Sequence, residues 1–398
     1  MSRIIFLLVL SVGIASPALA ARRVSIEQFE QMLNRAQGQS DGKVAGQISA
    51  VELTERASSI RLARWESDFP GRHCHEAFTE LADASAFLDL PSADMPTYSP
   101  PDRQTQKAML AKAAEFVDKT FSRLPNFYAT RKTEHFEDTP YHETLEHVSM
   151  PATGRGARSG GIPSVTSEVS EYRPMHSSGK SSETVGYRDG YELRNSQRID
   201  RSKLSQPGQS LTTAGEFGPI LSVVIQDSER GKTTWGFWEQ GAGVVEAVFR
   251  YSVPAGIGSY MVALPHGKQI EQIFPAYHGE IAVDPASGDI LRITVVADFA
   301  PPDEIVKTSI LVEYASTSIG GTPYICPVRS VALSKMPVYT SDDGGKQSVS
   351  SLVQTQLNDV AFIDYHLFRS EARILTGDSV SGEETPAGAP PPASQSPR

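Results

Sequence analysis

Two short segments carry residue types that bind metal ions. The segment Tyr141–His147 reads Tyr-His-Glu-Thr-Leu-Glu-His, and its two histidines lie five positions apart. A zinc protease helix needs histidines four positions apart, so that both imidazoles reach one face. His73, Cys74 and His75 are direct neighbours, and no second cluster of such residues accompanies them. We therefore predict no metal and no cofactor, polar surface side chains at the first segment, and a redox or structural role for Cys74.

A serine hydrolase is the other chemistry for which suitable residue types are present. Ser177 and Lys180 have the spacing of a serine–lysine acylating pair, but the motifs that accompany it in such enzymes are missing. The glycines at 154–156 and the Gly-Lys-Thr at 231–233 lack the context of a phosphate-binding loop. A dispersed site could still use Ser177, Ser330 or one of the nine histidines. The patterns favour a protein without enzymatic activity.

The first twenty residues are typical of a secretory signal peptide. Arg3 gives a positive start, residues 4–15 are almost entirely apolar, and Ala18-x-Ala20 is a small-residue cleavage signature. We predict cleavage between Ala20 and Ala21 and a periplasmic or secreted location. No later stretch is long and apolar enough to span a bilayer, which predicts no transmembrane anchor after cleavage. The net charge of −10 speaks against nucleic acid as a partner, because proteins that bind it carry basic patches.

Cys74 and Cys326 are the two cysteines of the chain. An oxidising compartment would allow them to form a disulfide. The closed loop would be very long, so chain entropy would contribute on the order of 5 kcal/mol. Two buried free thiols are the alternative. The sequence leaves both open, because it does not give the separation of the two residues in space.

Residues 21–125 are predicted to form a helical region. Ser25 and Gln28 resemble a capping box, and apolar residues recur at helical spacing over 26–36. We expect a second helix with an apolar stripe from Lys43 to Ile60, a third over 78–88, and a fourth over 109–124. Pro125 ends the fourth helix, because proline cannot continue the backbone hydrogen bonding.

Residues 126–375 are predicted to form antiparallel β-structure. Asp189-Gly190 between two short strands indicates a hairpin, and residues 216–226 indicate a short helix. The stretches 153–161 and 176–182 are rich in glycine and serine and are expected to be long loops. Residues 376–398 are dominated by proline, serine, glycine and alanine, which predicts a disordered tail.

The clearest strand pair covers residues 279–299. Arg292 and Thr294 lie on one face of the return strand, and the opposite face carries apolar residues: Leu291, Ile293, Val295 and Phe299. A strand with one apolar and one polar face is typical of an antiparallel sheet that is covered on one side. We take the four apolar residues as the face that would contact an apolar ligand.

Several segments resemble known exported proteins. Residues 279–293 and the amphipathic strands that follow resemble the curved sheets of periplasmic lipoprotein carriers of the LolA and RseB type. The chain as a whole resembles a family of uncharacterised exported bacterial proteins, through the segments 51–56, 81–89, 124–131 and 324–330. The carrier resemblance implies a half-barrel whose concave apolar face shelters acyl chains.

These observations predict an α+β fold: an N-terminal helical region, a large antiparallel, half-barrel-like curved sheet, and the C-terminal tail. The leading functional hypothesis is an exported, non-enzymatic binding protein that holds a lipidic or other apolar ligand on the sheet. Its partner would be a lipid, a lipoprotein or an envelope protein. If the apolar face instead packs on the N-terminal helices, the protein is a structural or interaction module of the cell envelope. The dispersed-site hydrolase is the third hypothesis.

Overall fold

The computed structural model describes residues 21–139, 142–149, 163–170, 173–198, 211–241, 243–266, 269–300, 306–341 and 347–368. The predicted signal peptide with Ala20, the predicted loop 153–161 and the predicted tail 376–398 lie outside these ranges. The chain divides into two compact units, Met1–Leu367 and Phe368–Arg398, and the elements below belong to the first. Its fold is mixed α+β with a large, open antiparallel sheet, as the sequence predicts.

Four helices form a compact layer at the N-terminal end of the described chain: α1 (Ile26–Ala36), α2 (Asp41–Ile48), α3 (Ser59–Asp68) and α4 (Arg72–Ser85). Their core is built around Phe29, Trp65 and Phe78, whose rings contact one another edge-on or tilted. The predicted capping box is confirmed, because Ser25 and Gln28 exchange side-chain to backbone hydrogen bonds at the start of α1. We call α1–α4 the helical layer.

The second predicted helix was wrong in its extent. α2 ends at Ile48, and β2 (Val51–Leu53) pairs in parallel with β1 (Arg22–Val24) before α3 begins at Ser59. Val51 and Leu53 are buried while Glu52 between them is exposed. That alternation has the period of a strand, and it was taken for part of a helical stripe.

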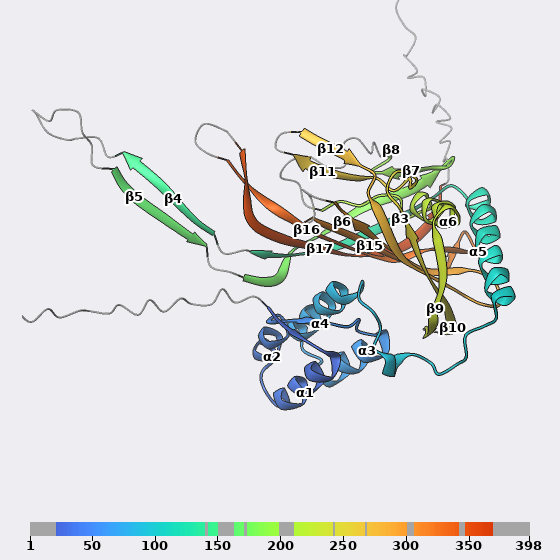
Figure 1. The fold of residues 1–398 in the computed structure, drawn as a ribbon, viewed down its shortest axis with the longest axis horizontal. Helices are drawn as coiled ribbons and strands as arrows, with labels where there is room; N and C mark the ends of the chain where they lie inside the picture. Colours follow the sequence, from blue (N-terminus) through green and yellow to red (C-terminus); the bar gives the residue numbers. More distant parts are fainter. Residues whose placement is uncertain are drawn as a thin grey trace, which may run out of the picture. The chain divides into compact units, whose positions relative to one another are not determined.

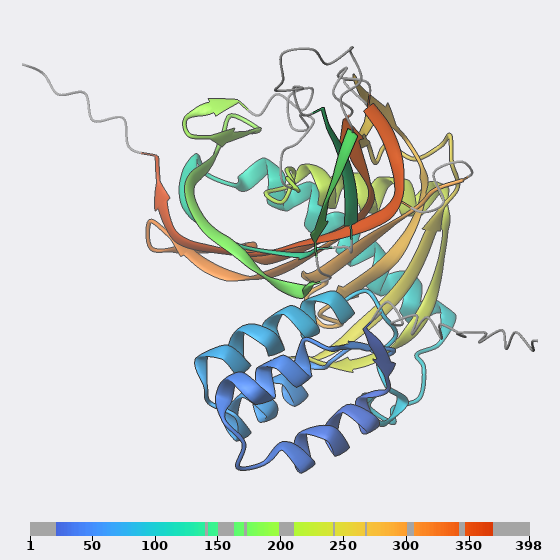
Figure 2. The ribbon, with the colours of Figure 1, turned by 90° about the vertical axis from the view of Figure 1, so that its left-hand side faces the viewer.

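The large sheet has eleven antiparallel strands in the order β8-β7-β6-β3-β17-β16-β15-β14-β13-β10-β9. It curves strongly, as Figure 2 shows. Its strands are β3 (Phe127–Thr139), β6 (Arg173–Arg188), β7 (Tyr191–Arg194), β8 (Gln197–Arg198), β9 (Lys232–Gln240), β10 (Val245–Val253), β13 (Ala276–Val283), β14 (Ile290–Asp298), β15 (Lys307–Ile319), β16 (Thr322–Ser341) and β17 (Gln347–Leu367). Two separate hairpins, β4 (His142–Ser149) with β5 (Pro163–Ser170) and β11 (Val262–His266) with β12 (Gln269–Ile273), extend from it (Figure 1).

Two local predictions in the β region had different outcomes. The Asp189-Gly190 hairpin is confirmed: both residues have positive φ, and β6 pairs with β7 across them. The stretch 176–182 is not a loop but part of β6, paired with β3 along its length. Its serine and glycine content resembles a linker, yet a strand needs only backbone groups to pair, and β3 provides a long partner.

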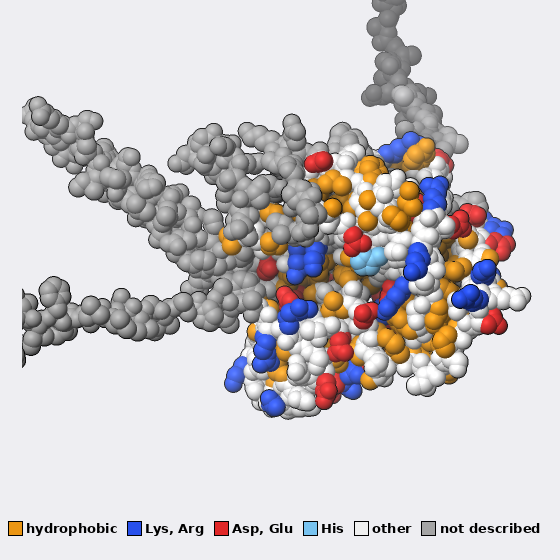
Figure 3. All heavy atoms as spheres, in the orientation of Figure 1, with side chains coloured by type: hydrophobic (Ala, Val, Ile, Leu, Met, Phe, Trp, Pro, Cys, Tyr) orange, Lys and Arg blue, Asp and Glu red, His pale blue; other side chains and the backbone are white. Residues whose placement is uncertain are grey.

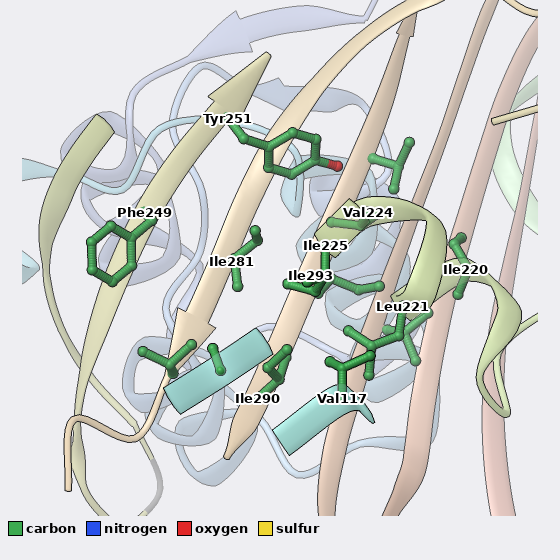
Figure 4. Close-up of a cluster of buried hydrophobic side chains, with 14 of the residues drawn as sticks. Val117, Ile220, Leu221, Val224, Ile225, Phe249, Tyr251, Ile281, Ile290 and Ile293 are labelled. Carbon is green, nitrogen blue, oxygen red and sulfur yellow. The ribbon is translucent and has the colours of Figure 1, made fainter. Parts of the chain in front are cut away.

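The sheet is covered on both faces, whereas the sequence predicted cover on one. Helices α5 (Arg103–Arg123) and α6 (Pro219–Arg230) lie against the concave face, and the helical layer lies against the convex face (Figure 2). On the concave side, residues of α5 and α6 form the main core with β10, β13, β14 and β15 (Figure 4). On the convex side, α4 contacts β6 and β17. No described helix is long and apolar enough to cross a membrane.

Candidate functional site

An apolar pocket lies where α5 and α6 meet the concave face. Its lining residues come from α5 and the residue after it, from β3, from α6 and the turn before it, and from β15 and β16: Phe116, Leu124, Phe127, Phe217, Leu221, Tyr314, Ile325, Cys326 and Pro327. Its enclosed volume is small, about 10 Å³, which is room for about one water molecule, so a larger ligand needs the pocket to widen. Almost all of its lining is apolar, as expected for a site that holds an apolar ligand.

The turn before α6 places Phe217 in the pocket wall. Gly215 and Gly218 have φ angles of 108° and 153°, which residues with a Cβ rarely adopt. The carboxylate of Glu192 on β7 accepts hydrogen bonds from the backbone N–H groups of Gly215 and Phe217, both at 2.7 Å. Phe217 packs edge-on against Phe127, with ring centroids 5.5 Å apart. This wall is therefore fixed by the backbone as well as by packing.

Tyr314 is the one lining residue of the pocket whose side chain carries a hydroxyl. The residue is 7% exposed, and its hydroxyl has no hydrogen-bond partner among the described residues. Tyr365 nearby differs, because its hydroxyl donates to the backbone oxygen of Pro327. Burial, together with the negative charges of Glu216 and Glu192, raises the pKa of Tyr314 well above its ordinary value. The hydroxyl therefore stays protonated and is available as a donor.

The acidic side chains near Tyr314 are held by other groups. Glu216 accepts a hydrogen bond from Thr213 Oγ1 at 2.5 Å and lies 3.6 Å from the guanidinium of Arg131. Arg131 also pairs with Glu183 of β6, with Nη1 and Oε1 3.1 Å apart. Because Arg131 is engaged by two acids, it does not offer an open anion site.

The four residues predicted to form the ligand face do not lie together on an open surface. Ile293 (Figure 4) is fully buried beneath α5 and α6, and Val295 belongs to the same buried core. Leu291 is half-buried at a β-bulge, where Ile290 pairs with Val283 and Arg292 pairs with Ala282. Phe299 belongs to a separate cluster with residues of β11. The alternative for this face was packing against the N-terminal helices. Ile293 and Val295 do pack against a helix of that region, α5.

The serines singled out by sequence lie apart. Ser177 donates to Glu134 Oε1 at 3.2 Å, and Ser330 is 0% exposed with no hydrogen-bond partner in the described structure. Ser330 shares a cross-strand row with Val312, which packs under α5 and α6, so it lies on the concave face. Neither serine forms a hydrogen bond with a histidine among the described residues. Residues 142–147 of the histidine-containing segment belong to β4, while Tyr141 and the side chains of the segment are not among the described parts of the structure.

A different serine is hydrogen-bonded to a histidine on the concave face. Ser181 Oγ lies 3.0 Å from His135 Nε2, and His135 Nδ1 lies 2.8 Å from Asn358 Oδ1. The Asn358 amide nitrogen donates to the backbone oxygen of Leu211 at 2.7 Å, which fixes the amide orientation. With Nδ1–H donating to Asn358, Nε2 is the basic nitrogen and faces Ser181, as a general base should. No local sequence pattern marks this group, because its members lie on three different strands.

Cys74 and Cys326 are free thiols, so the disulfide allowed by the sequence is not formed. They belong to different cores: Cys74 packs within the helical layer, and Cys326 lines the concave pocket. Burial raises the pKa of each thiol to about 12, so neither is a reactive thiolate at neutral pH. Among the residues that the structure describes, no group of three or more His, Cys, Asp or Glu side chains could hold a metal ion.

Buried ion pairs join the helical layer to the convex face. Arg56, between β2 and α3, donates to Glu239 of β9 at 2.8 Å. Arg292 of β14 donates two hydrogen bonds to the same carboxylate, at 3.0 and 2.7 Å. Burial alone would raise the pKa of Glu239, but Arg292 and Arg56 outweigh it and hold this pKa below its ordinary value. Arg292, predicted on a polar exposed face, is therefore buried because the helical layer supplies its cover.

A half-buried arginine links α4 to the same face. Arg329 of β16 donates to Asp83 of α4 and, at 3.0 Å, to Asp359 of β17. In the sheet register, Arg292, Glu313 and Arg329 form one cross-strand row of alternating charge. On the outer surface, acidic and basic side chains are interspersed, with hydrophobic patches between them (Figure 3). The convex face is thus the surface on which the helical layer packs, and the apolar pocket on the concave face is the better candidate for ligand binding.

Comparison with known proteins gives little further support. No family model matches the sequence, and no curated protein matches it significantly. A LolA superfamily protein from Nitrosomonas europaea aligns over 66% of this chain and 93% of its own, with 10% identity and a TM-score of 0.24. MucB, in a complex with the MucA periplasmic segment, aligns over 64% and 93%, with 11% identity and a TM-score of 0.17. Neither similarity supports an inference about function, so the function is argued from the pocket itself.

Proposed function

We propose that this chain is an exported, non-enzymatic binding protein that holds an apolar ligand between α5, α6 and the concave face of the sheet. The pocket beside Tyr314, with its almost wholly apolar lining, carries the proposal. Apolar surface that a ligand covers is removed from water, and this contributes about 25 cal/mol for each Å² buried. The signal peptide predicted from the sequence supports binding in the periplasm or outside the cell.

Helix α5 is the element that would admit a larger ligand. Its buried residues, Met109, Ala113 and Val117, lie four positions apart and form one narrow stripe, while most of its other side chains are partly or fully exposed. Lys112 Nζ donates to the backbone oxygen of Ala286 at the turn between β13 and β14. Leu110, Ala114 and Phe116 pack partly against the same core. A helix on the outside of a sheet, with few fully buried residues, opens at lower cost than the strands beneath it. We propose that a long acyl chain enters when α5 moves outward.

Native mass spectrometry of protein purified without detergent from an envelope fraction tests the proposal. We expect the wild-type chain to carry an excess mass that disappears after extraction with organic solvent. Ile325→Trp adds a bulky ring inside the pocket and should reduce the loaded fraction at least tenfold. Ile257→Trp, the same change at an exposed loop residue, should leave the loaded fraction unchanged.

The opposite results have a clear meaning. A wild-type chain at its bare mass would contradict ligand binding and favour the structural or interaction module of the envelope. Equal loading of Ile325→Trp and Ile257→Trp would show that a ligand binds elsewhere. Thermal unfolding of both variants identifies any loss of loading that arises from loss of the fold.

Ester hydrolysis is a second candidate function, favoured by the Ser181–His135–Asn358 hydrogen bonds. In this reaction Ser181 Oγ attacks the ester carbonyl while its proton passes to His135 Nε2. The leaving alkoxide takes that proton as its bond to carbon breaks, and water then releases the acid from Ser181 with His135 again as base. Ser181 is exposed, so a substrate can reach it.

Hydrolysis of 4-nitrophenyl butyrate checks this candidate. If it is correct, the wild type exceeds the buffer rate, and Ser181→Ala lowers the excess at least tenfold. Ser177→Ala is the matched control, because Ser177 lies on the same strand but donates to Glu134, and it should keep the full rate. A wild-type rate equal to that of buffer, or of Ser181→Ala, would remove the candidate.

A further inference from the structure

We propose that the turn between β13 and β14, residues 284–289, is a latch that keeps α5 closed over the concave face, and that its contact with Lys112 sets how often α5 opens to admit a ligand. This inference rests on the proposed function and adds the element that regulates ligand entry. Two features of the described residues carry it: the rigidity of the turn and its direct contact with the backbone of α5.

The turn is held in shape by its own hydrogen bonds. The Asp284 carboxylate accepts a hydrogen bond from the backbone N–H of Ala286 at 2.7 Å, and the backbone oxygen of Asp284 accepts one from the N–H of Gly288 at 2.9 Å. The residues on either side of the turn, Val283 and Ile290, are fully buried in the main core. We therefore expect the turn to keep its position when α5 moves.

Gly288 lies directly against the backbone of α5. A Cβ atom at this position would lie 2.5 Å from the Cβ of Lys112 and 2.9 Å from its carbonyl carbon, closer than Cβ atoms approach other groups in folded proteins. Only glycine permits this approach, and its φ of 83° also favours glycine. Lys112 Nζ then donates to the backbone oxygen of Ala286 at 2.9 Å. The turn thus holds one residue of α5 by a backbone contact and by a hydrogen bond.

The position of this contact on α5 makes it a latch. The buried stripe of the helix consists of Met109, Ala113 and Val117, and Lys112 is the neighbour of its central residue. The chain before α5, residues 95–102, contains neither helix nor strand. A helix that follows such a linker can move outward as one piece when the contacts of its stripe are released. The turn therefore restrains α5 at the place where the helix meets the sheet.

Hydrogen exchange followed by mass spectrometry measures how often α5 opens. In Gly288→Ala the new Cβ overlaps with the backbone of α5, and the amides of α5 should exchange about tenfold faster than in the wild type, an effect typical of overpacking. The matched control is Gly190→Ala, because Gly190 has a φ of 84° but nothing within 4 Å of its Cβ position. This control should leave exchange in α5 unchanged. Exchange in α1, which reports opening of the whole fold, should be unchanged in both variants.

Lys112→Met tests the same contact without strain in the turn, and it decides the matter if Gly288→Ala does not fold. Loss of one exposed hydrogen bond should accelerate exchange in α5 about threefold. Lys107→Met, the same change at another exposed lysine of α5, should have no effect. Equal exchange of α5 in Gly288→Ala and Gly190→Ala, or in Lys112→Met and Lys107→Met, would overturn this inference alone.

Stopped-flow uptake of N-phenyl-1-naphthylamine, a neutral dye that fluoresces in apolar sites, links the latch to ligand entry. If entry requires α5 to open, Gly288→Ala should take up the dye about tenfold faster than the wild type, and Gly190→Ala should take it up at the wild-type rate. Unchanged uptake by Gly288→Ala despite faster exchange in α5 would overturn the inference, because the dye would then not enter beneath α5. Absence of dye binding to the wild type would contradict the proposed function and the role of the latch in ligand entry, and the exchange rates distinguish that result from failure of the latch itself.

Discussion

Glu239→Gln is expected to lower the free energy of unfolding at pH 7 by about 3–5 kcal/mol, which is the cost of leaving buried charge uncompensated. Glu239 accepts hydrogen bonds from both Arg56 and Arg292, and all three residues are less than 10% exposed. Glutamine keeps the shape of the side chain but loses its charge. Two guanidinium groups would then remain buried, with Glu280 as their nearest other acid, 3.8 Å from Arg56 and 3.3 Å from Arg292.

Urea unfolding followed by circular dichroism measures this effect. The control is Glu115→Gln, which breaks an exposed ion pair with Lys119 on α5 and should change stability by less than about 1 kcal/mol. A loss below 1 kcal/mol for Glu239→Gln would show that the ion pairs do not hold the helical layer on the sheet. A larger slope of unfolding with urea than in the wild type would indicate that the native state itself has changed.

The strands and most helices could be predicted because their signals are local. Alternation of apolar and polar residues marks β14 and β15, and proline at position 125 follows the end of α5. These patterns need only neighbours within one element. The alternation of buried and exposed residues over Val51–Leu53 covers only three residues. It is too short to outweigh the helical spacing of the residues around it, and β2 was missed for that reason.

The site could not be predicted, because its residues meet only through the fold. The pocket is lined by Phe116 of α5, by Phe217 of a turn, and by Tyr314 and Ile325 of neighbouring strands. In the sequence, none of these residues differs from an ordinary core residue. Of the predicted ligand face, Ile293 and Val295 lie on the concave side of the sheet, where α5 and α6 cover them. Which apolar stretch stays accessible depends on where helices pack, and periodicity does not contain that information.

Burial of charged residues on the convex face could not be predicted from the sequence either. Arg292 alternates with apolar residues and was assigned to a solvated face. In the structure it is buried because Arg56 and Glu239, distant in sequence, complete an ion-pair network above it. A charged residue in a strand therefore indicates which face it occupies, but not whether another layer covers that face. Glu246, which is half-buried and has no ion pair among the described residues, shows the effect of burial on a carboxylate of this face.

Glu246→Gln is expected to stabilise the protein at alkaline pH, the opposite of Glu239→Gln, although the two residues are cross-strand partners on β10 and β9. Burial raises the pKa of Glu246 to about 7, from an ordinary value of 4.5; Arg292 opposes this shift and the nearby charge of Glu239 adds to it. Between these pH values the unfolded chain has lost this proton while the folded chain keeps it. Stability therefore falls as pH rises from 4.5 through 7, by at most about 3 kcal/mol.

Glutamine cannot ionise, so Glu246→Gln should match the wild type at pH 4 and exceed its free energy of unfolding by up to about 3 kcal/mol at pH 8. Glu239 acts with the opposite sign: its lowered pKa contributes stability above pH 4.5 that is lost as pH falls through the folded-state value. Urea unfolding of both variants at pH 4, 6 and 8 measures the two slopes. A pH-independent difference between Glu246→Gln and the wild type would show that the carboxyl is solvated, and the helical layer would then not cover this end of the sheet as described.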